Sequence, residues 1–496
     1  MKLSEIIRNL DILRMEGKAD VEINSICSDS RKVQPGSLFI AVKGYASDGH
    51  AYIPQAIEKG AVAIIVEEGA YALPSANNKA DAPGRAYAPS FVQVANSRKA
   101  VALAADAFYG HPSGKLTLVG ITGTNGKTTT VTLLYNLFRE LGYSCGLLST
   151  IANYVGEERL ETENTTVDPI TLNSLLARMV GKGCEYCFME VSSIGVEQER
   201  VTGLEFAMGI FSNLTHDHLD YHKTFAEYLR CKKLFFDNLP KKAIALINAD
   251  DKNGPVMVQN TRAKVVTYSV TGLADHTARM MEQNFDGMLL KIDGVDTWCR
   301  LIGRHNAYNL LTIYSTAVCL GADPTEVLVA LSKLESAPGR LENLHGPKGL
   351  SVIVDYAHTP DALENVLVTL RDIAPERMLI CLFGCGGDRD KTKRPEMAQV
   401  AQKLADRLVI TSDNPRTEVP EAIIEDIKAG LDSKGLAKSL IITDRREAIR
   451  TAILTAPENA TILLAGKGHE TYQVIGHEKT HFDEKEIVTQ TFKLIS

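Results

Sequence analysis

The chain has 496 residues, of which 45% are hydrophobic and 23% charged, a composition typical of soluble globular proteins rather than disordered or fibrous ones. The formal charge of -7, from 54 basic and 61 acidic residues, offers no basic stripe for a nucleic acid. A chain of this length is expected to form about three domains. Anionic ligands would be bound by local groups such as helix N-termini, single arginines and metal ions.

The N-terminus and the cysteines indicate a reducing, aqueous compartment. Residues 1–5 lead directly into a charged amphipathic pattern, without the apolar core of a signal peptide. No apolar run approaches the length of about 18 residues that a membrane span requires. We therefore expect a cytoplasmic protein with no membrane partner. The nine cysteines lack a framework spacing and indicate free thiols, and the lone CxxC of Cys184 and Cys187 favours a buried strand over a metal or redox site.

The first segment, residues 1–112, predicts a small α/β domain. Its short apolar runs, such as 37–42 and 61–66, are separated by glycine-containing turns and helical patterns. The stretch 73–90, rich in Pro, Ala, Asn and Asp, is typical of a surface loop.

Residues 113–340 predict a parallel-sheet domain, because apolar strands alternate with amphipathic helices and such alternation favours right-handed crossovers. The expected strands are 116–121, 187–191, 207–211 and 243–248, with a helix after Lys127. The alternation breaks at 336–339. It resumes in apolar runs at 350–354, 378–382 and 407–410, which predict a third α/β domain over residues 341–496.

A phosphate-binding loop is predicted between the first strand and helix of the central domain, where residues 119–129 read VGITGTNGKTT. Glycines let backbone N–H groups approach phosphate oxygens, and the helix N-terminus adds positive potential. Lys127 would neutralise charge, and the Thr128 hydroxyl could bind Mg²⁺. The usual spacing places glycine at position 121, so Ile121 makes this a variant of the consensus.

Two further clusters follow strands of the same predicted sheet. The first, MEVSS at 189–193, offers Glu190 as a ligand for Mg²⁺, although a strand-terminal Glu is by itself more often a cap or an ion-pair partner. The second, FSNLTHDHLDYH at 211–222, holds three His and two Asp. Mg²⁺ prefers oxygen, so at most one of these imidazoles is expected as a ligand.

Polar turns also follow the predicted strands of the third domain. They are DYAHTP at 355–360, GCGGDRDK at 384–391, DNPR at 413–416 and GKGHE at 466–470. Open α/β sheets bind ligands at the carboxyl ends of their strands, so these turns are expected to line one edge. Arg389 could bind a carboxylate through both arms of its guanidinium.

Taken in order, these motifs resemble the Mur ligases, and within them the branch that adds the third residue of the peptidoglycan precursor peptide. The resemblance runs from Asp29-Ser30-Arg31 to the GKGHE segment and so covers nearly the whole chain. It implies an N-terminal domain that binds a UDP group and a central P-loop ATPase-like domain. It also implies a C-terminal Rossmann-like domain that binds the incoming amino acid.

The resemblance implies three sets of binding residues. The set for the UDP-linked muramoyl dipeptide comprises Ser28, Ser30, Tyr45, Ala46, Ser47, Asn164, Thr165, Thr166, Ser192, Gln198 and Arg200. The set for ATP comprises Gly123, Thr124, Asn125, Gly126, Lys127, Thr128, Thr129, Asn309, Arg340 and Asp355. The set for meso-diaminopimelate comprises Arg389, Asp413, Asn414, Pro415, Arg416, Gly466 and Glu470.

The resemblance also implies a carbamylated lysine. Lys232, in the segment YLRCKKLF at 228–235, matches a lysine that the family modifies, which turns a cation into an oxygen ligand for Mg²⁺. A lysine on a helix is otherwise a solvated surface residue, so this role rests on the resemblance alone. Thr128, Glu190 and His218 would complete the metal set, and Lys127, Glu190, His218 and Lys232 are the expected catalytic residues.

The implied reaction is ATP-dependent amide formation through an acyl phosphate, by a monomer acting on small molecules. Arg416 favours meso-diaminopimelate, because a side-chain carboxylate needs a cationic partner and an ammonium would be repelled. A lysine-adding ligase is the nearest alternative. Folylpolyglutamate synthetase is the next, although it leaves the DNPR element unexplained, and an ATP-binding scaffold without catalysis is a third.

Overall fold

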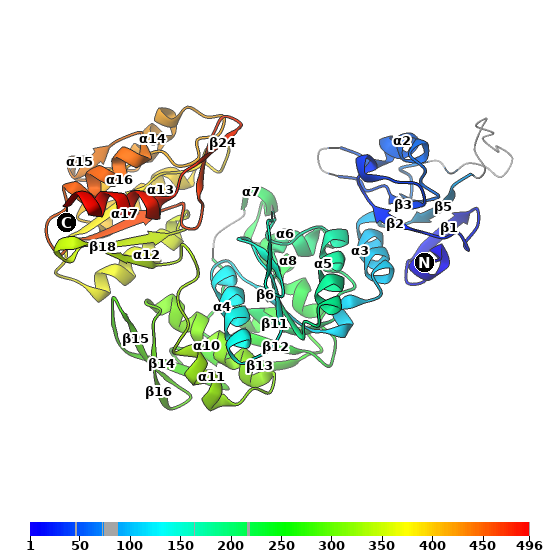
Figure 1. Ribbon diagram of the computed structural model, residues 1–496, viewed down its shortest axis with the longest axis horizontal. Helices are drawn as coiled ribbons and strands as arrows, with labels where there is room; N and C mark the ends of the chain where they lie inside the picture. The colour runs from blue at the N-terminus through cyan, green and yellow to red at the C-terminus, as the bar shows by residue number, and fades with distance from the viewer. Residues whose placement is uncertain (45–46, 72, 74–87, 163, 216–218, 496) are drawn as a thin grey trace.

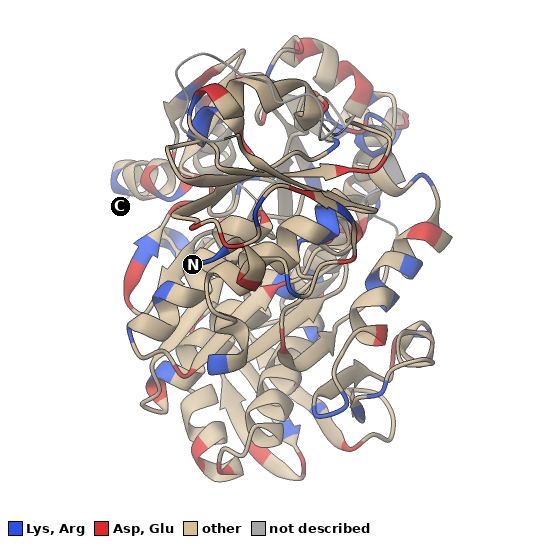
Figure 2. Ribbon diagram, turned by 90° about the vertical axis from the view of Figure 1, so that its right-hand side faces the viewer, with Lys and Arg blue, Asp and Glu red and all other residues tan. Residues whose placement is uncertain are grey.

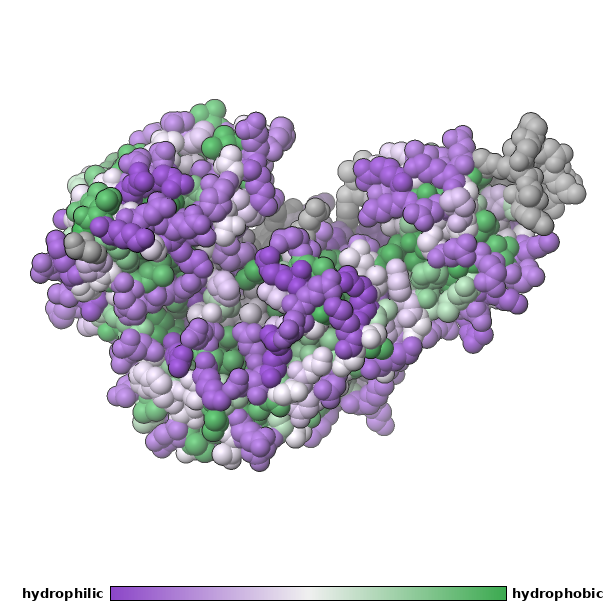
Figure 3. All heavy atoms as spheres, viewed as in Figure 1, coloured by the Kyte–Doolittle hydropathy of each residue, from purple (hydrophilic) through white to green (hydrophobic). Residues whose placement is uncertain are grey.

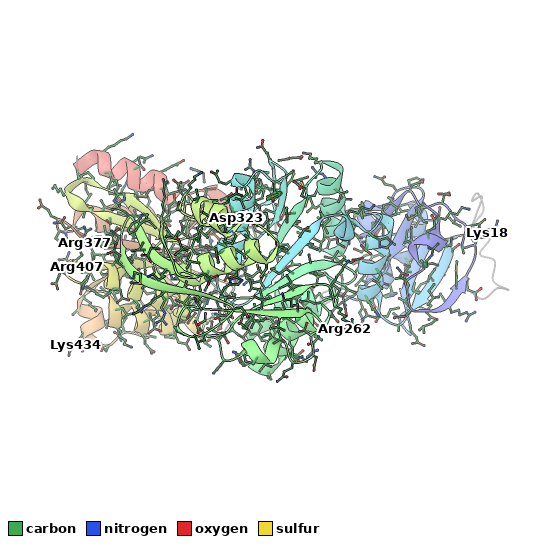
Figure 4. All side chains as sticks on the ribbon, turned by 90° about the horizontal axis from the view of Figure 1, so that it is seen from below. Lys18, Arg262, Asp323, Arg377, Arg407 and Lys434 are labelled. Carbon is green, nitrogen blue, oxygen red and sulfur yellow. The ribbon has the colours of Figure 1, made fainter. Side chains whose placement is uncertain are left out.

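A computed structural model describes residues 1–495 except 45–46, 72, 74–87, 163 and 216–218. It contains three α/β units, each built around its own sheet, as the sequence predicts (Figure 1). The units follow the chain order along the long axis, with Lys18 near one end and Arg407 and Lys434 near the other (Figure 4). Among the described residues, no helix combines the length and apolarity needed to cross a membrane.

The N-terminal sheet has the order β1-β5-β4-β3-β2, with every pair parallel except β1 and β5. Its inner strands are buried on both faces, as parallel strands between helices are. Helices α1 and α3 cover one face, and α2 covers the other. The elements are α1 (Leu3–Ile6), β1 (Ile12–Glu16), β2 (Ser25–Cys27), η1 (Ser30–Lys32), β3 (Ser37–Ile40), η2 (Gly49–Tyr52), α2 (Ile53–Glu58), β4 (Ala63–Glu67), β5 (Ser90–Val94), α3 (Ser97–Phe108) and η3 (Pro112–Lys115).

The central sheet has eleven strands in the order β16-β15-β14-β13-β12-β11-β6-β10-β7-β8-β9. Its middle is parallel, as predicted, and both edges are antiparallel: β7 to β9 on one side and β14 to β16 on the other. Helices α4, α10 and α11 pack on one face, and α5 and α8 pack on the other.

The strands of this domain are β6 (Thr117–Thr122), β7 (Cys145–Leu148), β8 (Asn153–Val155), β9 (Glu158–Leu160), β10 (Tyr186–Glu190), β11 (Phe206–Phe211), β12 (Ile244–Asn248), β13 (Lys264–Ser269), β14 (His276–Asn284), β15 (Gly287–Ile292) and β16 (Val295–Cys299). The helices are α4 (Lys127–Glu140), α5 (Pro169–Gly181), α6 (Ser193–Glu197), α7 (Leu219–His222), α8 (Phe225–Asp237), α9 (Gly254–Met257), α10 (Arg304–Cys319) and α11 (Pro324–Leu331).

The C-terminal sheet has the order β17-β18-β22-β19-β20-β21, and only β17 is antiparallel to its neighbour. Helices α12, α13 and α14 pack on one face, and α16 and α17 pack on the other. The elements are β17 (Glu342–His345), η4 (Pro347–Gly349), β18 (Ser351–Asp355), α12 (Pro360–Ile373), β19 (Leu379–Phe383), α13 (Lys393–Leu404), β20 (Arg407–Ile410), α14 (Pro420–Lys428), α15 (Ser433–Ala437), β21 (Ser439–Ile441), α16 (Arg445–Leu454), β22 (Thr461–Ala465), β23 (Tyr472–Ile475), β24 (Glu478–His481) and α17 (Glu484–Ile495).

The surface agrees with the charge balance of the sequence, because basic and acidic residues are interspersed on the face that Figure 2 shows. The N-terminal and C-terminal units rise on either side of the central one, and the space-filling view is hollowed between them (Figure 3). All nine cysteines are free. Cys184 and Cys187 are both buried, and Cys187 lies within β10 as predicted, whereas Cys184 precedes that strand.

Candidate active site

The predicted phosphate loop joins the centre of the main sheet to a helix. Strand β6 ends at Thr122 and α4 begins at Lys127. Gly126 has φ 88°, and a Cβ there would lie 2.6 Å from Asn309 Oδ1, so only glycine fits this turn. Lys127 Nζ donates to the Gly123 and Thr124 carbonyls at 2.9 and 2.8 Å. The ammonium is therefore held against the loop, at the positive end of α4, where an anion would bind.

A buried carboxylate lies beside the start of α4. Glu190 is 1% exposed and ends β10, the neighbour of β6. Its Oε1 accepts hydrogen bonds from Thr128 Oγ1 at 2.9 Å and from the Thr150 amide at 2.8 Å. The Thr150 hydroxyl also donates to it, at 3.1 Å. One carboxylate and two hydroxyls thus converge on a point that suits an oxygen-preferring cation such as Mg²⁺.

The rest of the predicted metal set is only partly described. His218 lies outside the described residues. Within the part of the chain that the structure describes, no three His, Cys, Asp or Glu side chains gather as a metal-binding group. Oxygens beyond the Glu190 carboxylate would therefore have to come from hydroxyls, from a modified lysine or from the ligand itself.

Lys232 on α8 is buried, so the ordinary expectation of a solvated helix lysine is wrong here. The residue is 1% exposed, and its Nζ donates to the Gly123 carbonyl at 2.8 Å. The same nitrogen lies 3.4 Å from Thr122 Oγ1 and 4.6 Å from the centroid of the Tyr228 ring. Strand β6, which leads into the phosphate loop, lies between β11 and β10 in the sheet. Because α8 follows β11 and Glu190 ends β10, Lys232 and Glu190 approach the loop from opposite sides of β6.

The residues predicted to bind the muramoyl dipeptide form a network on the Glu190 strand. Thr166 Oγ1 donates to the Glu190 carbonyl at 2.9 Å and accepts from the Ser192 amide at 3.0 Å. Arg200 donates to the Thr166 carbonyl and, at 2.7 Å, to Gln198 Oε1. Burial lowers the pKa of Arg200, although a guanidinium remains charged at neutral pH. Asn164 and Thr165 extend the same surface.

The residues predicted to bind the UDP group lie apart from this network. Ser28 and Ser30 follow β2, and Ser47 follows β3, so they share one sheet edge of the N-terminal unit. Ser30 is buried, and its hydroxyl donates to Gln55 Oε1 at 2.7 Å, whereas Ser28 and Ser47 are exposed. Tyr45 and Ala46 lie outside the described residues.

Arg340 and Asp355 lie where the central and C-terminal units meet. Asp355 is 6% exposed and accepts the Leu341 and Ala357 amides at 2.7 and 2.8 Å, while burial raises its carboxyl pKa. The Arg340 guanidinium lies 5.0 Å from the Tyr356 ring centroid, and its Nε is buried without a hydrogen-bond partner.

A direct hydrogen bond also joins the phosphate loop to the C-terminal unit. Asn125 Nδ2 donates to Asp361 Oδ2 at 2.9 Å. Asp361 lies in the first turn of α12, so this contact sets the beginning of that helix against the loop.

The residues predicted to bind the amino acid come from three turns of the C-terminal sheet. Arg416 Nη1 donates to the Gly387 carbonyl at 2.8 Å, and its backbone adopts φ 49°. Asn414 Nδ2 donates to Glu470 Oε2 at 2.8 Å, which ties the turn after β20 to the turn after β22. A Cβ at Gly387 would lie 1.9 Å from the Pro415 carbonyl, so the glycine permits the turns after β19 and β20 to meet.

These groups surround one cavity of about 970 Å³ between the central and C-terminal units. Its described lining includes, from the predicted sets, Thr124, Asn125, Gly126, Lys127, Thr128, Thr129, Asn164, Thr165, Thr166, Glu190, Ser192, Arg200, Lys232, Arg340, Arg389, Asp413, Asn414, Arg416, Gly466 and Glu470. The predicted residues that are described but do not line it are Ser28, Ser30, Ser47, Gly123, Gln198, Asn309, Asp355 and Pro415.

Sequence reasoning missed two residues that bear on this cavity. Thr150 follows β7 and bonds Glu190, and its position just after an apolar strand was a signal that could have found it. Lys467 stands inside the GKGHE segment but was not assigned a role. It is fully buried beneath Asp413 and Glu470.

The cavity brings a phosphate loop of one α/β unit against a surface of the next unit that bears both cations and carboxylates. This combination is that of an ATP-dependent ligase. Three family models match the chain: the Mur ligase family catalytic domain over residues 22–109, the Mur ligase middle domain over 121–317 and the Mur ligase glutamate ligase domain over 339–468. The chain belongs to the Mur ligase family.

A curated relative from Bacteroides fragilis is 52% identical, and the match covers 100% of both chains. It is named UDP-N-acetylmuramoyl-L-alanyl-D-glutamate--2,6-diaminopimelate ligase. A solved structure of an enzyme with that name shares 30% identity at TM-score 0.71, covering 100% of this chain and 99% of the other. Folylpolyglutamate synthase from Mycobacterium tuberculosis, at 18% identity and TM-score 0.58, covers 75% of this chain and 92% of its own, a likeness of fold alone.

Proposed function

We propose that this Mur ligase joins meso-2,6-diaminopimelate to UDP-N-acetylmuramoyl-L-alanyl-D-glutamate with ATP. One observation carries the proposal: the phosphate loop with Lys127 and the amino-acid surface with Arg416 line the same cavity. The names of the full-length relatives support the same reaction.

In the first step, the D-glutamyl carboxylate of the dipeptide attacks the γ-phosphorus of ATP. An acyl phosphate forms and ADP leaves, so a poor electrophile becomes a reactive one. Lys127 and the amides at the start of α4 stabilise the charge on the transferring phosphoryl group. Thr166, Ser192 and Arg200, which lie on the Glu190 side of the loop, hold the dipeptide with its carboxylate toward the phosphate.

In the second step, the amine of the incoming amino acid attacks the acyl carbon and phosphate leaves with its bonding electrons. The amine loses a proton and an amide results. Arg416 and Arg389 bind carboxylates of diaminopimelate, while Asp413 and Glu470 face its far ammonium. L-Lysine lacks the far carboxylate, so it would leave the Arg416 guanidinium without its anion.

We further propose that Mg²⁺ binds near Glu190 and Thr128, with Lys232 as a carbamate and His218 completing the set. The oxygens of Glu190, Thr128 and Thr150 converge, which fits this ion. When bound, Mg²⁺ would offset charge on the nucleotide phosphates. In support of the modification, Lys232 is buried with its Nζ beside the phosphate loop, rather than exposed to solvent as an ordinary helix lysine is.

The remaining assignments follow the same scheme. The N-terminal division, residues 1–112, binds the UDP group at the sheet edge that bears Ser28, Ser30 and Ser47. Residues 113–340 bind ATP, with Asn309, Arg340 and Asp355 completing the nucleotide site, and residues 341–496 bind the amino acid. All three substrates are small molecules, so we propose a monomer that works in the cytoplasm.

A substrate panel tests this function. The purified chain is given UDP-muramoyl dipeptide, ATP and Mg²⁺ with meso-diaminopimelate, L-lysine or L-ornithine. Phosphate release and the UDP-linked product are both measured. We expect phosphate and a tripeptide product with meso-diaminopimelate and far less with the other two. Equal or faster turnover with L-lysine would contradict the proposal.

A further inference from the structure

A buried lysine, Lys467, lies beneath the amino-acid end of the cavity. Lys467 follows β22 and has no exposed surface. Its Nζ lies 3.0 Å from Asn414 Oδ1, 3.2 Å from Glu470 Oε2 and 3.7 Å from Asp413 Oδ1. The lysine itself does not line the cavity, whereas these three partners do. A buried ammonium is stable only with such partners. Its three polar partners all face the ligand, and the rings of Tyr472 and Phe482 lie 5.8 and 5.7 Å from its Nζ outside the cavity lining.

The hydrogen bonds of the Asn414 side chain show how Lys467 acts on it. The Asn414 side-chain oxygen accepts from Lys467 Nζ and from the Val474 amide at 2.9 Å, which fills both of its lone pairs. The Asn414 amide nitrogen donates to Glu470 Oε2. The reversed amide would place its N–H₂ group against an ammonium and a backbone N–H, with four donors facing one another. Lys467, together with the Val474 amide and Glu470, therefore fixes which way Asn414 points.

Lys467 also sets the charge of this end of the cavity. The carboxylates of Asp413 and Glu470 bring two formal negative charges together, and the ammonium beneath them offsets one. Within this group of three side chains one formal negative charge remains, which matches a single ammonium group of a diamino acid, while Arg389 and Arg416 are left for its carboxylates. Without the lysine, the two carboxylates would repel each other and the turns after β20 and β22 would lose one of the cations that they share.

We propose that Lys467 is a positioning residue for the incoming amino acid, which acts through Asn414, Asp413 and Glu470 without touching the substrate. This inference rests on the proposed function, because it needs the amino acid to bind at this end of the cavity. It predicts that the buried lysine governs affinity for the amino acid and leaves the nucleotide end unaffected.

The test compares Lys467→Met and Lys467→Gln with a matched control, Lys438→Met. Methionine keeps the length and the apolar stem but removes the charge, and glutamine keeps a donor for Asn414. Lys438 is a partly buried lysine between α15 and β21 of the same domain that donates to the Gln402 and Ala405 carbonyls, away from the cavity. Steady-state KM and kcat are measured for ATP, UDP-muramoyl dipeptide and meso-diaminopimelate.

For Lys467→Met we expect the KM for meso-diaminopimelate to rise about tenfold to a hundredfold, the effect of leaving buried polar groups unpaired. The KM values for ATP and the dipeptide should stay within about twofold, because none of the three polar partners of Lys467 belongs to the residues assigned to those substrates. Lys467→Gln should lie between Lys467→Met and the unaltered chain, and Lys438→Met should match the unaltered chain. The stabilisation of the folded protein by meso-diaminopimelate, read as a thermal shift, should shrink in the same order.

Two results would overturn the inference. One is a fall in kcat with all three KM values unchanged, and the other is a failure of both Lys467 variants to fold, which would make the lysine a residue of the whole domain. Failure of the proposed function looks different, since the unaltered chain would then form no amide from meso-diaminopimelate.

Discussion

The two ends of the cavity are built in opposite ways. At the nucleotide end, one continuous segment supplies the loop, the lysine and the helix start, and Lys127 bonds carbonyls only three and four residues away. At the amino-acid end, Asn414 and Glu470 are 56 residues apart and meet only because β20 and β22 end at the same sheet edge. The first end depends on local backbone geometry, and the second depends on buried charges that hold separate turns together.

The largest effect should come from the buried arginine that ties these turns to one another. The side chain of Arg445 has no exposed surface, and its guanidinium donates to Glu484 Oε1 at 2.8 Å, to the Ser412 carbonyl at 3.3 Å and to the Ala465 carbonyl at 2.8 Å. Arg445→Met would leave Glu484 as an unpaired buried carboxylate. We expect the free energy of unfolding of the C-terminal domain to fall by about 3–5 kcal/mol in chemical denaturation.

The control for Arg445→Met is Arg450→Met on the same helix, α16. Arg450 makes an exposed ion pair with Glu447 at 2.8 Å. Its replacement should change the free energy of unfolding by no more than about 0.5 kcal/mol. If both changes lowered the free energy of unfolding equally, the buried arginine would contribute no more to stability than an exposed ion pair does.

The next effect concerns the local end of the cavity. Lys127→Met removes the ammonium at the start of α4 and should lower kcat by about a hundredfold to a thousandfold, because charge on the transferring phosphoryl group loses its stabilisation. The thermal unfolding temperature should stay close to that of the unaltered chain. The control is Lys333→Met, which breaks only an exposed ion pair with Glu140. An unchanged kcat in Lys127→Met would contradict the assignment of the phosphate loop.

The sequence predicted the nucleotide end better than the amino-acid end, because the first is formed by neighbours in the chain and the second by residues far apart in it. A phosphate loop is a run of neighbours whose spacing is visible in the chain, and the strands on both sides of it lie within a residue or two of their predicted bounds. The positions of Lys467 and Arg445 carry no such signal, because their partners are brought together by sheet order alone. The burial of Lys232 is another example, since its helix pattern does not reveal that it faces Gly123.

The antiparallel edges of the central sheet were also beyond the sequence pattern. Strands β14 to β16 are half-exposed and alternate irregularly, so they lack the continuous apolar runs that identified the parallel strands. Their position at the rim explains why the site could be located without them.

A smaller effect is expected for the cation that gives the amino-acid end its specificity. Arg416→Ala should raise the KM for meso-diaminopimelate about tenfold to a hundredfold, the contribution of hydrogen bonds to a charged group, with the KM for ATP unchanged. The control is Arg407→Ala, at the opposite end of β20 and at the outer rim of the molecule (Figure 4). Steady-state kinetics with all three substrates decides the matter, and an unaltered KM for the amino acid would refute the role of Arg416.

The smallest effect should be a pH dependence of the folding stability, arising where the central and C-terminal units meet near Arg340. Burial and, to a smaller extent, the charge of Arg340 together lower the pKa values of His305 and His469 to about 4, and the Nδ1 atom of each ring is buried without a partner. In the unfolded chain a histidine titrates near about 6.5, so between the two values the unfolded state binds more protons. The stability that these two neutral histidines contribute is therefore fully present above about pH 6.5 and declines as the pH falls toward 4.

His305→Phe should weaken this acid sensitivity, because the ring remains while the proton site is removed. Between pH 7.5 and pH 5, the unaltered chain should lose on the order of 1 kcal/mol more stability than the variant. Denaturant unfolding at the two pH values measures the difference, and His481→Phe is the control, since that ring is exposed and pairs with Glu486 at 2.9 Å. If His305→Phe and the unaltered chain lose stability in parallel, His305 does not titrate with folding, and the contacts that join the two ends of the cavity, such as that of Asn125 with the Asp361 carboxylate, do not depend on its protonation.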